Sequence, residues 1–277
     1  MRLINVNNEK CIKCGLCSNV CPMNSIVMGD NGPQAISEMC VKCGHCVAVC
    51  PREALDNVNL SLDNQIPLEN TQTLDADTAA GFLKSRRSIR NYKKTVIPRE
   101  KILQLLDVAR FAQTSANSQG TAYHVVDDAN TLRNITNAII SWAEEEIKKE
   151  SEFSSFLTTM MDFYHKTGED PILRNAPCLV ITTMNKDMPS SFKENGRFSL
   201  VYAELYAPSL GLGSCWCGIF EACFISGYKP LLSLLNLPEN IDVTGAILLG
   251  YPNYKLRRLV ERDPLRITWQ KSIDINN

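Results

Sequence analysis

One cysteine pattern occurs twice near the amino end of this 277-residue chain, and it limits the fold more than any other feature. The first copy is Cys11, Cys14, Cys17, Cys21 and Pro22, and the second is Cys40, Cys43, Cys46, Cys50 and Pro51. The copies are 29 residues apart (40 minus 11), and they also share Lys13 with Lys42 and Gly15 with Gly44. The pattern predicts an internal duplication with pseudo-twofold character. A segment this short with few large aliphatic residues cannot fold on an apolar core alone, so bound metal must stabilise it.

Both copies read C-x2-C-x2-C-x3-C-P, the spacing typical of 4Fe-4S clusters, and they resemble the bacterial ferredoxin signature. In that arrangement the fourth cysteine of each run binds the other cluster. The prediction is therefore one site of Cys11, Cys14, Cys17 and Cys50 and a second site of Cys40, Cys43, Cys46 and Cys21. We expect Gly15 and Gly44 inside tight ligand loops, where a residue without Cβ lets the backbone fold around the cluster. Zinc is the alternative, because C-x2-C pairs also bind it, but it does not explain two matching runs of four cysteines.

Length and composition indicate how the chain is divided into domains. The size of the chain suggests two domains, and a polar stretch rich in Asn, Asp and Gln follows the second cysteine run. We predict a ferredoxin-type domain over 1–58, a linker over 59–77 and a larger domain over 78–277. A net charge of -1 and a pI near 6.3 give no reason to expect a nucleic-acid or anionic-membrane partner.

The cysteine usage suggests a compartment. The amino end lacks the basic and apolar regions of a signal peptide, and no apolar run reaches the roughly eighteen residues of a membrane helix. Twelve cysteines in such a chain favour metal binding in a reducing, cytoplasmic setting over disulfides. The four cysteines outside the two runs are expected to be small buried hydrophobic residues: Cys178, Cys215, Cys217 and Cys223.

Beyond residue 76 the hydrophobic pattern alternates between helical and strand-like. A helix is expected from about Asp77, capped by Asp77 or Thr78, and another from Pro98 to Ala112. Three further helices are expected over 132–149, 153–165 and 197–210. Strands are expected over 121–127, 178–183 and 243–251. The alternation predicts a sheet covered by helices, in the α/β or α+β class.

Three segments of this larger region resemble the FMN-dependent nitroreductase family, and together they span most of it. The first is the run from Arg86 to Tyr92, similar to the R-x-S-x-R-x-F segment of the family. The resemblance implies that Arg86, Arg87, Ser88 and Arg90 hold the flavin phosphate and ribityl chain. Arginine suits that role because its planar guanidinium makes bidentate, charge-assisted contacts with phosphate.

The second segment, 112–119, resembles the A-P-S-x-x-N-x-Q turn of the family, although Gln113 replaces the common proline and Gly120-Thr121 the usual Pro-Trp. The resemblance implies that Thr114, Ser115 and Asn117 contact the flavin of the partner subunit. Short polar side chains suit the carbonyl and nitrogen edge of an isoalloxazine ring.

The third segment, 209–218, is very similar to the s-l-G-L-G-t-C-W-i-G run of the family. The resemblance implies that Cys215, Trp216 and Gly218 lie beside the flavin ring. Downstream, Leu249-Gly250-Tyr251-Pro252 and the basic residues after it resemble the carboxyl-terminal part of the family, which implies phosphate binding by Arg262 and next by Arg258.

The resemblance implies an α+β fold of three layers, α-β-α, beside the small ferredoxin-like domain, and a homodimer with FMN at the subunit interface. The expected function is an oxidoreductase that passes electrons from the clusters to FMN and then, as hydride, to nitroaromatic or other electrophilic unsaturated acceptors. No side chain is expected to be catalytic, because N5 of the flavin is the reacting atom. No G-x-G-x-x-G run follows a strand, which favours reduced ferredoxin or a comparable carrier as the donor. The resemblance leaves NAD(P)H open as well, because relatives bind it without that motif.

Three kinds of alternative remain open. The same scaffold suits an alkene reductase, a dehalogenase or an oxidative flavoenzyme. A non-catalytic electron carrier or redox sensor is an alternative of another class, and a flavin domain that has lost its cofactor is a third.

Overall fold

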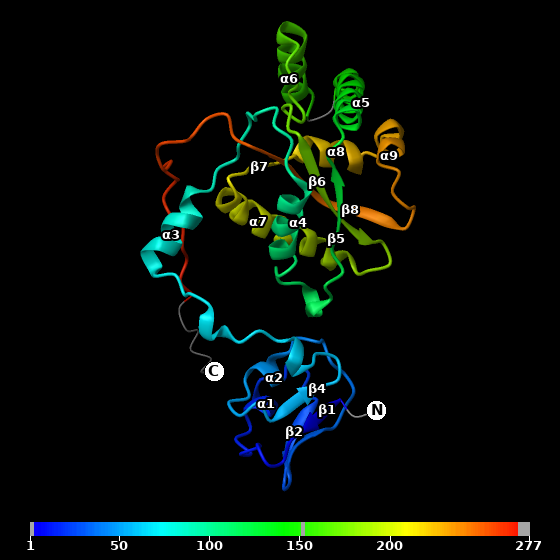
Figure 1. Cartoon of the computed structure of the whole chain (residues 1–277). Coiled ribbons are helices and arrows are strands. Elements are labelled where there is room, and N and C mark those ends of the chain that lie inside the picture. The colour runs from blue at the N-terminus through cyan, green and yellow to red at the C-terminus, as the bar shows by residue number, and fades with distance from the viewer. Residues whose placement is uncertain (1–2, 151–152, 271–277) are drawn as a thin grey trace, which may run out of the picture.

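The computed structural model describes residues 3–150 and 153–270. Figure 1 shows a small amino-terminal lobe and a larger lobe joined by an extended stretch of chain. In the small lobe, β1 (Ile4–Val6) pairs antiparallel with β4 (Leu55–Asn57), and β2 (Ile26–Gly29) forms a hairpin with β3 (Gly32–Ala35). Two single-turn helices, α1 (Leu16–Asn19) and α2 (His45–Ala48), follow the first two cysteines of each run and contain the third.

Each of these short helices begins directly after a duplicated glycine. Gly15 and Gly44 have φ of +79° and +74°, the left-handed region that side chains disfavour. The core around them is small, and its buried members are Leu3, Ile4, Cys17, Ile26, Cys46, Val47 and Leu55. Both findings agree with the expectation of tight ligand loops in a lobe with little apolar core.

The connecting stretch contains two 3-10 turns, η1 (Leu62–Asn64) and η2 (Leu68–Asn70), and then helix α3 (Ala76–Ser85). The expectation that Asp77 or Thr78 caps this helix is wrong. Asp75 is the N-cap, and its carboxylate accepts hydrogen bonds from the backbone N–H and the hydroxyl of Thr78. No residue of α3 is buried. The domain boundaries at 58 and 78 remain a prediction.

The larger lobe is built on a four-stranded antiparallel sheet with the order β5-β6-β8-β7. Its strands are β5 (Ala122–Val126), β6 (Cys178–Asn185), β7 (Gly213–Trp216) and β8 (Ile241–Gly250). Alternate residues of β6 and β8 enter opposite cores. Leu179 and Leu248 join one core, whereas Val180 and Ile247 join the other.

Helices cover both faces (Figure 1). Helices α4 (Arg99–Ala109) and α7 (Lys193–Tyr206) supply the core on one face. The other core receives residues from α5 (Ala129–Lys148), α6 (Ser154–Thr167), α8 (Gly218–Ile225) and α9 (Lys229–Leu235). Three further 3-10 turns are η3 (Ser115–Asn117), η4 (Ser190–Phe192) and η5 (Ala207–Leu210). The predicted three-layer α+β fold is confirmed.

Several boundaries differ from the expectation. The helix expected over 197–210 starts four residues earlier, at Lys193, and its last part is the 3-10 turn η5 that ends at Gly211 with φ +71°. Pro98 precedes the first turn of α4 as its N-cap rather than occupying it. Strand β7 and helices α8 and α9 were not predicted.

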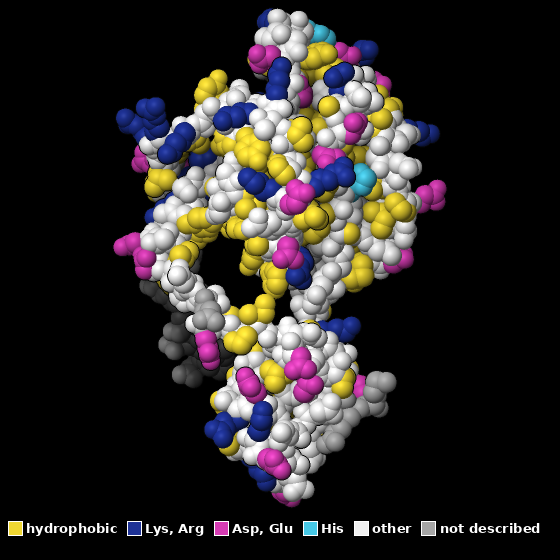
Figure 2. Space-filling view, in the orientation of Figure 1, with side chains coloured by type: hydrophobic (Ala, Val, Ile, Leu, Met, Phe, Trp, Pro, Cys, Tyr) yellow, Lys and Arg dark blue, Asp and Glu magenta, His cyan; other side chains and the backbone are white. Residues whose placement is uncertain are grey.

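After β8 the described chain runs as an extended arm over 253–270 in which every residue is exposed. Figure 1 shows this arm as an extended trace without helix or strand, and Figure 2 shows hydrophobic side chains among the charged ones on the surface. Within the described residues no helix is both long and apolar enough to cross a membrane.

Candidate functional site

The eight cysteines of the duplicated runs form two groups in space. Cys11, Cys14, Cys17 and Cys50 line one cavity, and Cys21, Cys40, Cys43 and Cys46 line another. This is the crossed grouping predicted from the sequence. In each group the four cysteines surround one cavity. Among the described residues no three His, Cys, Asp or Glu side chains are placed to hold a single ion.

Hydrogen-bond donors point at some of the ligand sulfurs. The backbone N–H of Ala54 donates to Cys50 Sγ at 3.2 Å, and that of Lys42 donates to Cys40 Sγ at 3.4 Å. In the second group the amide of Asn57 also donates to Cys46 Sγ at 3.7 Å. Burial raises the pKa of the Cys46 thiol, and this amide opposes that rise because it favours the thiolate. Thiolate ligands with N–H donors around them suit a 4Fe-4S cluster.

The predicted phosphate segment lies along the edge of the sheet. The N–H of Ile89 donates to the carbonyl of Ser214 in β7 at 2.8 Å, and Tyr92 forms a bridge with Pro252 after β8. The structure therefore brings together three stretches that the sequence analysis linked to one site, namely 86–92, 209–218 and 249–252.

Arg86 is held by a buried carboxylate. Its guanidinium lies 3.5 Å from Glu204 Oε1 on α7, and the same oxygen accepts a hydrogen bond from Ser214 at 3.2 Å. Burial raises the pKa of Glu204, and Arg86 and Ser214 counteract that rise. Arg86 is thus oriented by the fold, while Arg87 and Ser88 beside it are half-buried.

A cavity of about 540 Å³ opens beside the third predicted segment. Four predicted cofactor residues line it: Arg90, Cys215, Trp216 and Gly218. Much of the remaining wall is aromatic or aliphatic and includes Phe153 and Phe156 at the start of α6. The volume is within the usual range for small-molecule sites.

Two cations line this largely apolar space, Arg90 and Arg174. Within the described part of the chain neither guanidinium has an ion-pair or hydrogen-bond partner. An apolar cavity with two unpaired guanidinium groups and a glycine-started helix at its wall is suited to a planar aromatic ligand that carries negative charge. The residues present therefore fit a flavin nucleotide.

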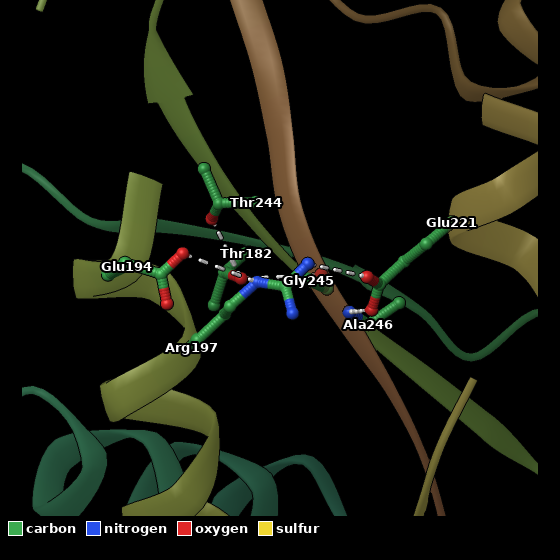
Figure 3. Close-up of polar contacts among 7 residues, drawn as sticks. All are labelled: Thr182, Glu194, Arg197, Glu221, Thr244, Gly245 and Ala246. Atoms are coloured by element: carbon green, nitrogen blue, oxygen red, sulfur yellow. Dashed lines mark hydrogen bonds and ion pairs between the residues drawn. The ribbon is translucent and has the colours of Figure 1, made fainter. Parts of the chain in front are cut away.

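Trp216 is oriented by a polar group behind the cavity. The guanidinium of Arg197 lies 5.6 Å from the centre of the Trp216 ring and 3.2 Å from Glu221. Glu221 also accepts a hydrogen bond from the N–H of Ala246 at 3.0 Å. Figure 3 shows Arg197 between Glu194 and Glu221, with the hydroxyl of Thr244 bonded to that of Thr182 nearby.

Burial raises the pKa of Glu221, and the contacts with Ala246, Arg197 and Trp216 lower it. Helix α7 can approach the sheet here because residue 196 is glycine: a Cβ at this position would lie 2.0 Å from the hydroxyl of Thr244. The first turn of α7 is thereby fixed against the strands.

The second predicted segment lies where the two lobes meet. Asn117 donates its amide hydrogens to the carbonyls of Val41 and Lys42, both at 2.8 Å, in the cysteine loop of the second group. The segment is tied to α7 as well, because the N–H of Ser115 donates to Asn195 Oδ1 at 2.9 Å. Thr114 stabilises the turn by accepting from the N–H of Gln119.

Contacts of Thr114, Ser115 and Asn117 with a partner's flavin remain a prediction. Arg258 and Arg262 lie in the exposed carboxyl-terminal arm, away from the cavity lining. Their role in phosphate binding also remains a prediction. The four leftover cysteines are buried, as expected, although Cys215 and Cys217 also line the cavity.

Sequence reasoning missed Glu204, Glu221, Arg197 and Arg174. A signal for the two glutamates was present, since each is the one charged residue in a short apolar stretch, LVYAELY and GIFEACFI. A buried carboxylate in such a place needs a cation or several N–H donors. Nothing in the local sequence singled out Arg174.

Comparison with known proteins gives two family matches. Residues 83–251 match the nitroreductase family, and residues 3–51 match a 4Fe-4S dicluster domain. A provisionally named NADH dehydrogenase/NAD(P)H nitroreductase of Archaeoglobus fulgidus is 28% identical over 172 residues, which cover 61% of this chain and 82% of that protein. An iodotyrosine deiodinase of Thermotoga neapolitana is 24% identical over 170 residues, 61% of this chain and 86% of that protein.

A solved structure is similar over the larger lobe as well. A nitroreductase with bound FMN from Bacteroides fragilis aligns with a TM-score of 0.55 and 22% identity, over 68% of this chain and 97% of that one. At this identity the likeness concerns the fold, and it agrees with the three layers described above. Because the family match covers more than half of the sequence, this chain belongs to the nitroreductase family and carries a 4Fe-4S dicluster domain at its amino end.

Proposed function

We propose that this chain is an FMN-dependent oxidoreductase that reduces nitroaromatic or other electrophilic unsaturated acceptors with electrons collected at its two 4Fe-4S sites. The observation that carries the proposal is the cavity lined by Arg90, Trp216 and Gly218 in the same chain as two complete cysteine sets. When bound, the clusters supply one-electron transfer, and FMN supplies the conversion of single electrons to hydride.

The residues of the larger lobe supply binding and orientation. Arg86, fixed by Glu204, and Arg90 offer guanidinium groups to the phosphate and to the polar edge of the ring. Trp216, held by Arg197, bounds the ring side of the cavity. No side chain is assigned a nucleophilic or acid–base role.

The acceptor is expected to lie between the ring position and α6. Phe153, Phe156 and Met160 give this wall an aromatic and apolar character, which favours flat aromatic acceptors and limits the access of water. Arg174 at the rim favours acceptors with a nitro or carboxylate group, because its guanidinium lacks a partner in the described structure.

A homodimer is part of the proposal. The isolated chain leaves α3 without a buried residue, and the arm exposes Tyr254, Leu259, Leu265 and Trp269. Exposed apolar side chains in this number favour association with a second copy. The proposed setting is the reducing cytoplasm, with reduced ferredoxin or NAD(P)H as the donor.

The test is anaerobic purification of the full chain, with iron, sulfide and flavin quantified, followed by stopped-flow mixing of the reduced protein with a panel of acceptors. We expect about eight irons per chain and flavin reoxidation much faster with nitroaromatics than with buffer. If the flavin is reoxidised no faster with any acceptor than with buffer, the proposed reductase activity is refuted, and a non-catalytic electron carrier or redox sensor is the alternative that fits.

Reductive removal of halide is the second candidate function. The similarity to the iodotyrosine deiodinase of Thermotoga neapolitana favours it. Halogenated phenols and halotyrosines belong in the same acceptor panel, with release of halide as the readout that separates this activity from nitro reduction.

A further inference from the structure

The two halves of the small lobe differ at one duplicated position. The 29-residue offset pairs Asn57 with Met28 (57 minus 28), and each is the third residue of its strand, β4 or β2. Each side chain also lines the cavity of its own cysteine group, Met28 the first and Asn57 the second. The duplication therefore places an amide at one site where the other has a thioether.

The amide of Asn57 is directed at ligand sulfur. The residue is 3% exposed, and its Nδ2 lies 3.7 Å from Cys46 Sγ and 4.0 Å from Cys40 Sγ. The side chain of Met28 has no N–H to offer the first group. Reduction adds negative charge to a cluster and its sulfurs, so a donor aimed at them stabilises the reduced form more than the oxidised form. The effect is strengthened because the amide is buried, where the effective dielectric constant is low.

One difference acts in the opposite direction. Arg52 and Lys13 line the first cavity, and the residue duplicated from Arg52 in the second is the uncharged Met23. Positive charge also favours a reduced cluster. Both cations are exposed, however, and solvent and salt screen exposed charges far more than buried dipoles. The buried amide is therefore the larger influence.

The second site is also the one that faces the larger lobe. Asn117 binds the carbonyls of Val41 and Lys42, which lie between the ligands Cys40 and Cys43. From Asn117 the chain of contacts continues to Asn195 and the first turn of α7, whose Arg197 lies over Trp216 at the cavity. Within the described residues the loop of the first cysteine group makes no such hydrogen bond to the larger lobe.

We propose that Asn57 gives the Cys21, Cys40, Cys43 and Cys46 site the higher reduction potential, and that electrons therefore leave the small lobe through this site. The direction of transfer rests on the proposed function, and the difference in potential does not. With both clusters bound, each transfer would oxidise the first by one electron and reduce the second by one, with no bond or proton exchanged. The electron comes from an external one-electron donor of the reduced-ferredoxin type.

The test is a potentiometric titration of the anaerobically purified full chain, followed by electron paramagnetic resonance. Two reciprocal variants are compared with the parent protein, Asn57→Met, which removes the amide from the second site, and Met28→Asn, which adds one at the first. In N57M the reduced-to-oxidised ratio of the higher-potential cluster at fixed solution potential should fall about tenfold or more. A tenfold fall corresponds to a decrease of about 59 mV in the reduction potential of a one-electron couple. In M28N the lower-potential cluster should become easier to reduce.

A higher-potential cluster whose ratio does not fall in N57M would overturn the proposal, as would a shift confined to the lower-potential cluster. Asn57 Oδ1 also accepts from the N–H of Asn59, so N57M can lose the turn there. If that variant fails to assemble both clusters, M28N decides alone: an unchanged lower-potential cluster then refutes the role of the amide. The titration needs no acceptor and no turnover, so its result is independent of whether the chain reduces nitroaromatics.

Discussion

The contact between the lobes can be tested by removing one side chain. Asn117 donates two hydrogen bonds of 2.8 Å to the cysteine loop of the second site. Its φ is +51°, so Asn117→Gly removes the amide without adding backbone strain. Ala116→Gly is the matched control, because Ala116 has φ +52° in the same turn and makes no hydrogen bond with the small lobe.

The expected magnitude follows from the two bonds. Each net hydrogen bond contributes about 0.5–1.5 kcal/mol, so their loss weakens docking of the lobes by about 1–3 kcal/mol. That range corresponds to an increase of about 5- to 150-fold in the ratio of undocked to docked chains. The bonds are partly exposed, which favours the lower half of the range.

Hydrogen exchange followed by mass spectrometry measures the change in the intact, cluster-loaded chain. Peptides covering 39–44 and 112–119 should exchange faster in N117G than in A116G, whereas the sheet of the larger lobe should not change. The rate at which a reduced small lobe bleaches the flavin should fall in N117G as well. Equal exchange of both peptides in the two variants would refute the assignment of Asn117 as the link between the lobes.

Three further predictions concern other parts of the molecule. Glu221→Leu leaves the buried N–H of Ala246 without an acceptor, so it should lower the free energy of unfolding by about 1–3 kcal/mol, measured by urea titration with tryptophan fluorescence. Glu221→Gln keeps an acceptor and should lower that free energy by less. Equal losses in the two variants would contradict this. The pKa of Asp128 is lowered by the N–H and hydroxyl of Thr131, so its contribution to stability is present above the unfolded carboxyl pKa and is lost as pH falls through the folded one. Asp128→Asn, which still caps α5, should remove this part of the acid dependence of thermal unfolding, and an unchanged pH profile would speak against it. Iron chelation under reducing conditions should abolish exchange protection over 3–57 and spare the larger lobe; a protected small lobe without iron would show that its apolar core suffices.

The sequence predicted those parts of the site whose signal is local. The ligand cysteines and the glycines with left-handed backbone lie within a few residues of one another in the sequence. Both cysteine groups lie in space as their spacing indicated. Trp216 and Gly218, which belong to the continuous segment 209–218, line the cavity, and their contact with a flavin stays a prediction.

The remainder depends on contacts between residues far apart in the chain. Arg86 meets Glu204, and Asn117 meets Val41, across 118 and 76 residues. No spacing rule encodes such pairs. Helix α8 packs against both β8 and α5, so its sequence, GIFEACFI, is apolar on most sides and shows little helical periodicity. A helix without that periodicity is not recognised from the sequence. Strand β7 was missed because it has only four residues and begins with a glycine, Gly213, two positions after Gly211, which is typical of a loop.

Gly196 has a consequence for how this protein can diverge. Its neighbour on one side, Asn195, holds the turn that grips the small lobe, and its neighbour on the other, Arg197, lies against the indole at the cavity. Because residue 196 has no room for a side chain, these two functions share one immobile helical turn. A mutation in this turn that improves the contact with one lobe therefore also alters the contact with the other. The two lobes are for this reason expected to constrain each other's sequence changes at this turn, although they occupy separate parts of the chain.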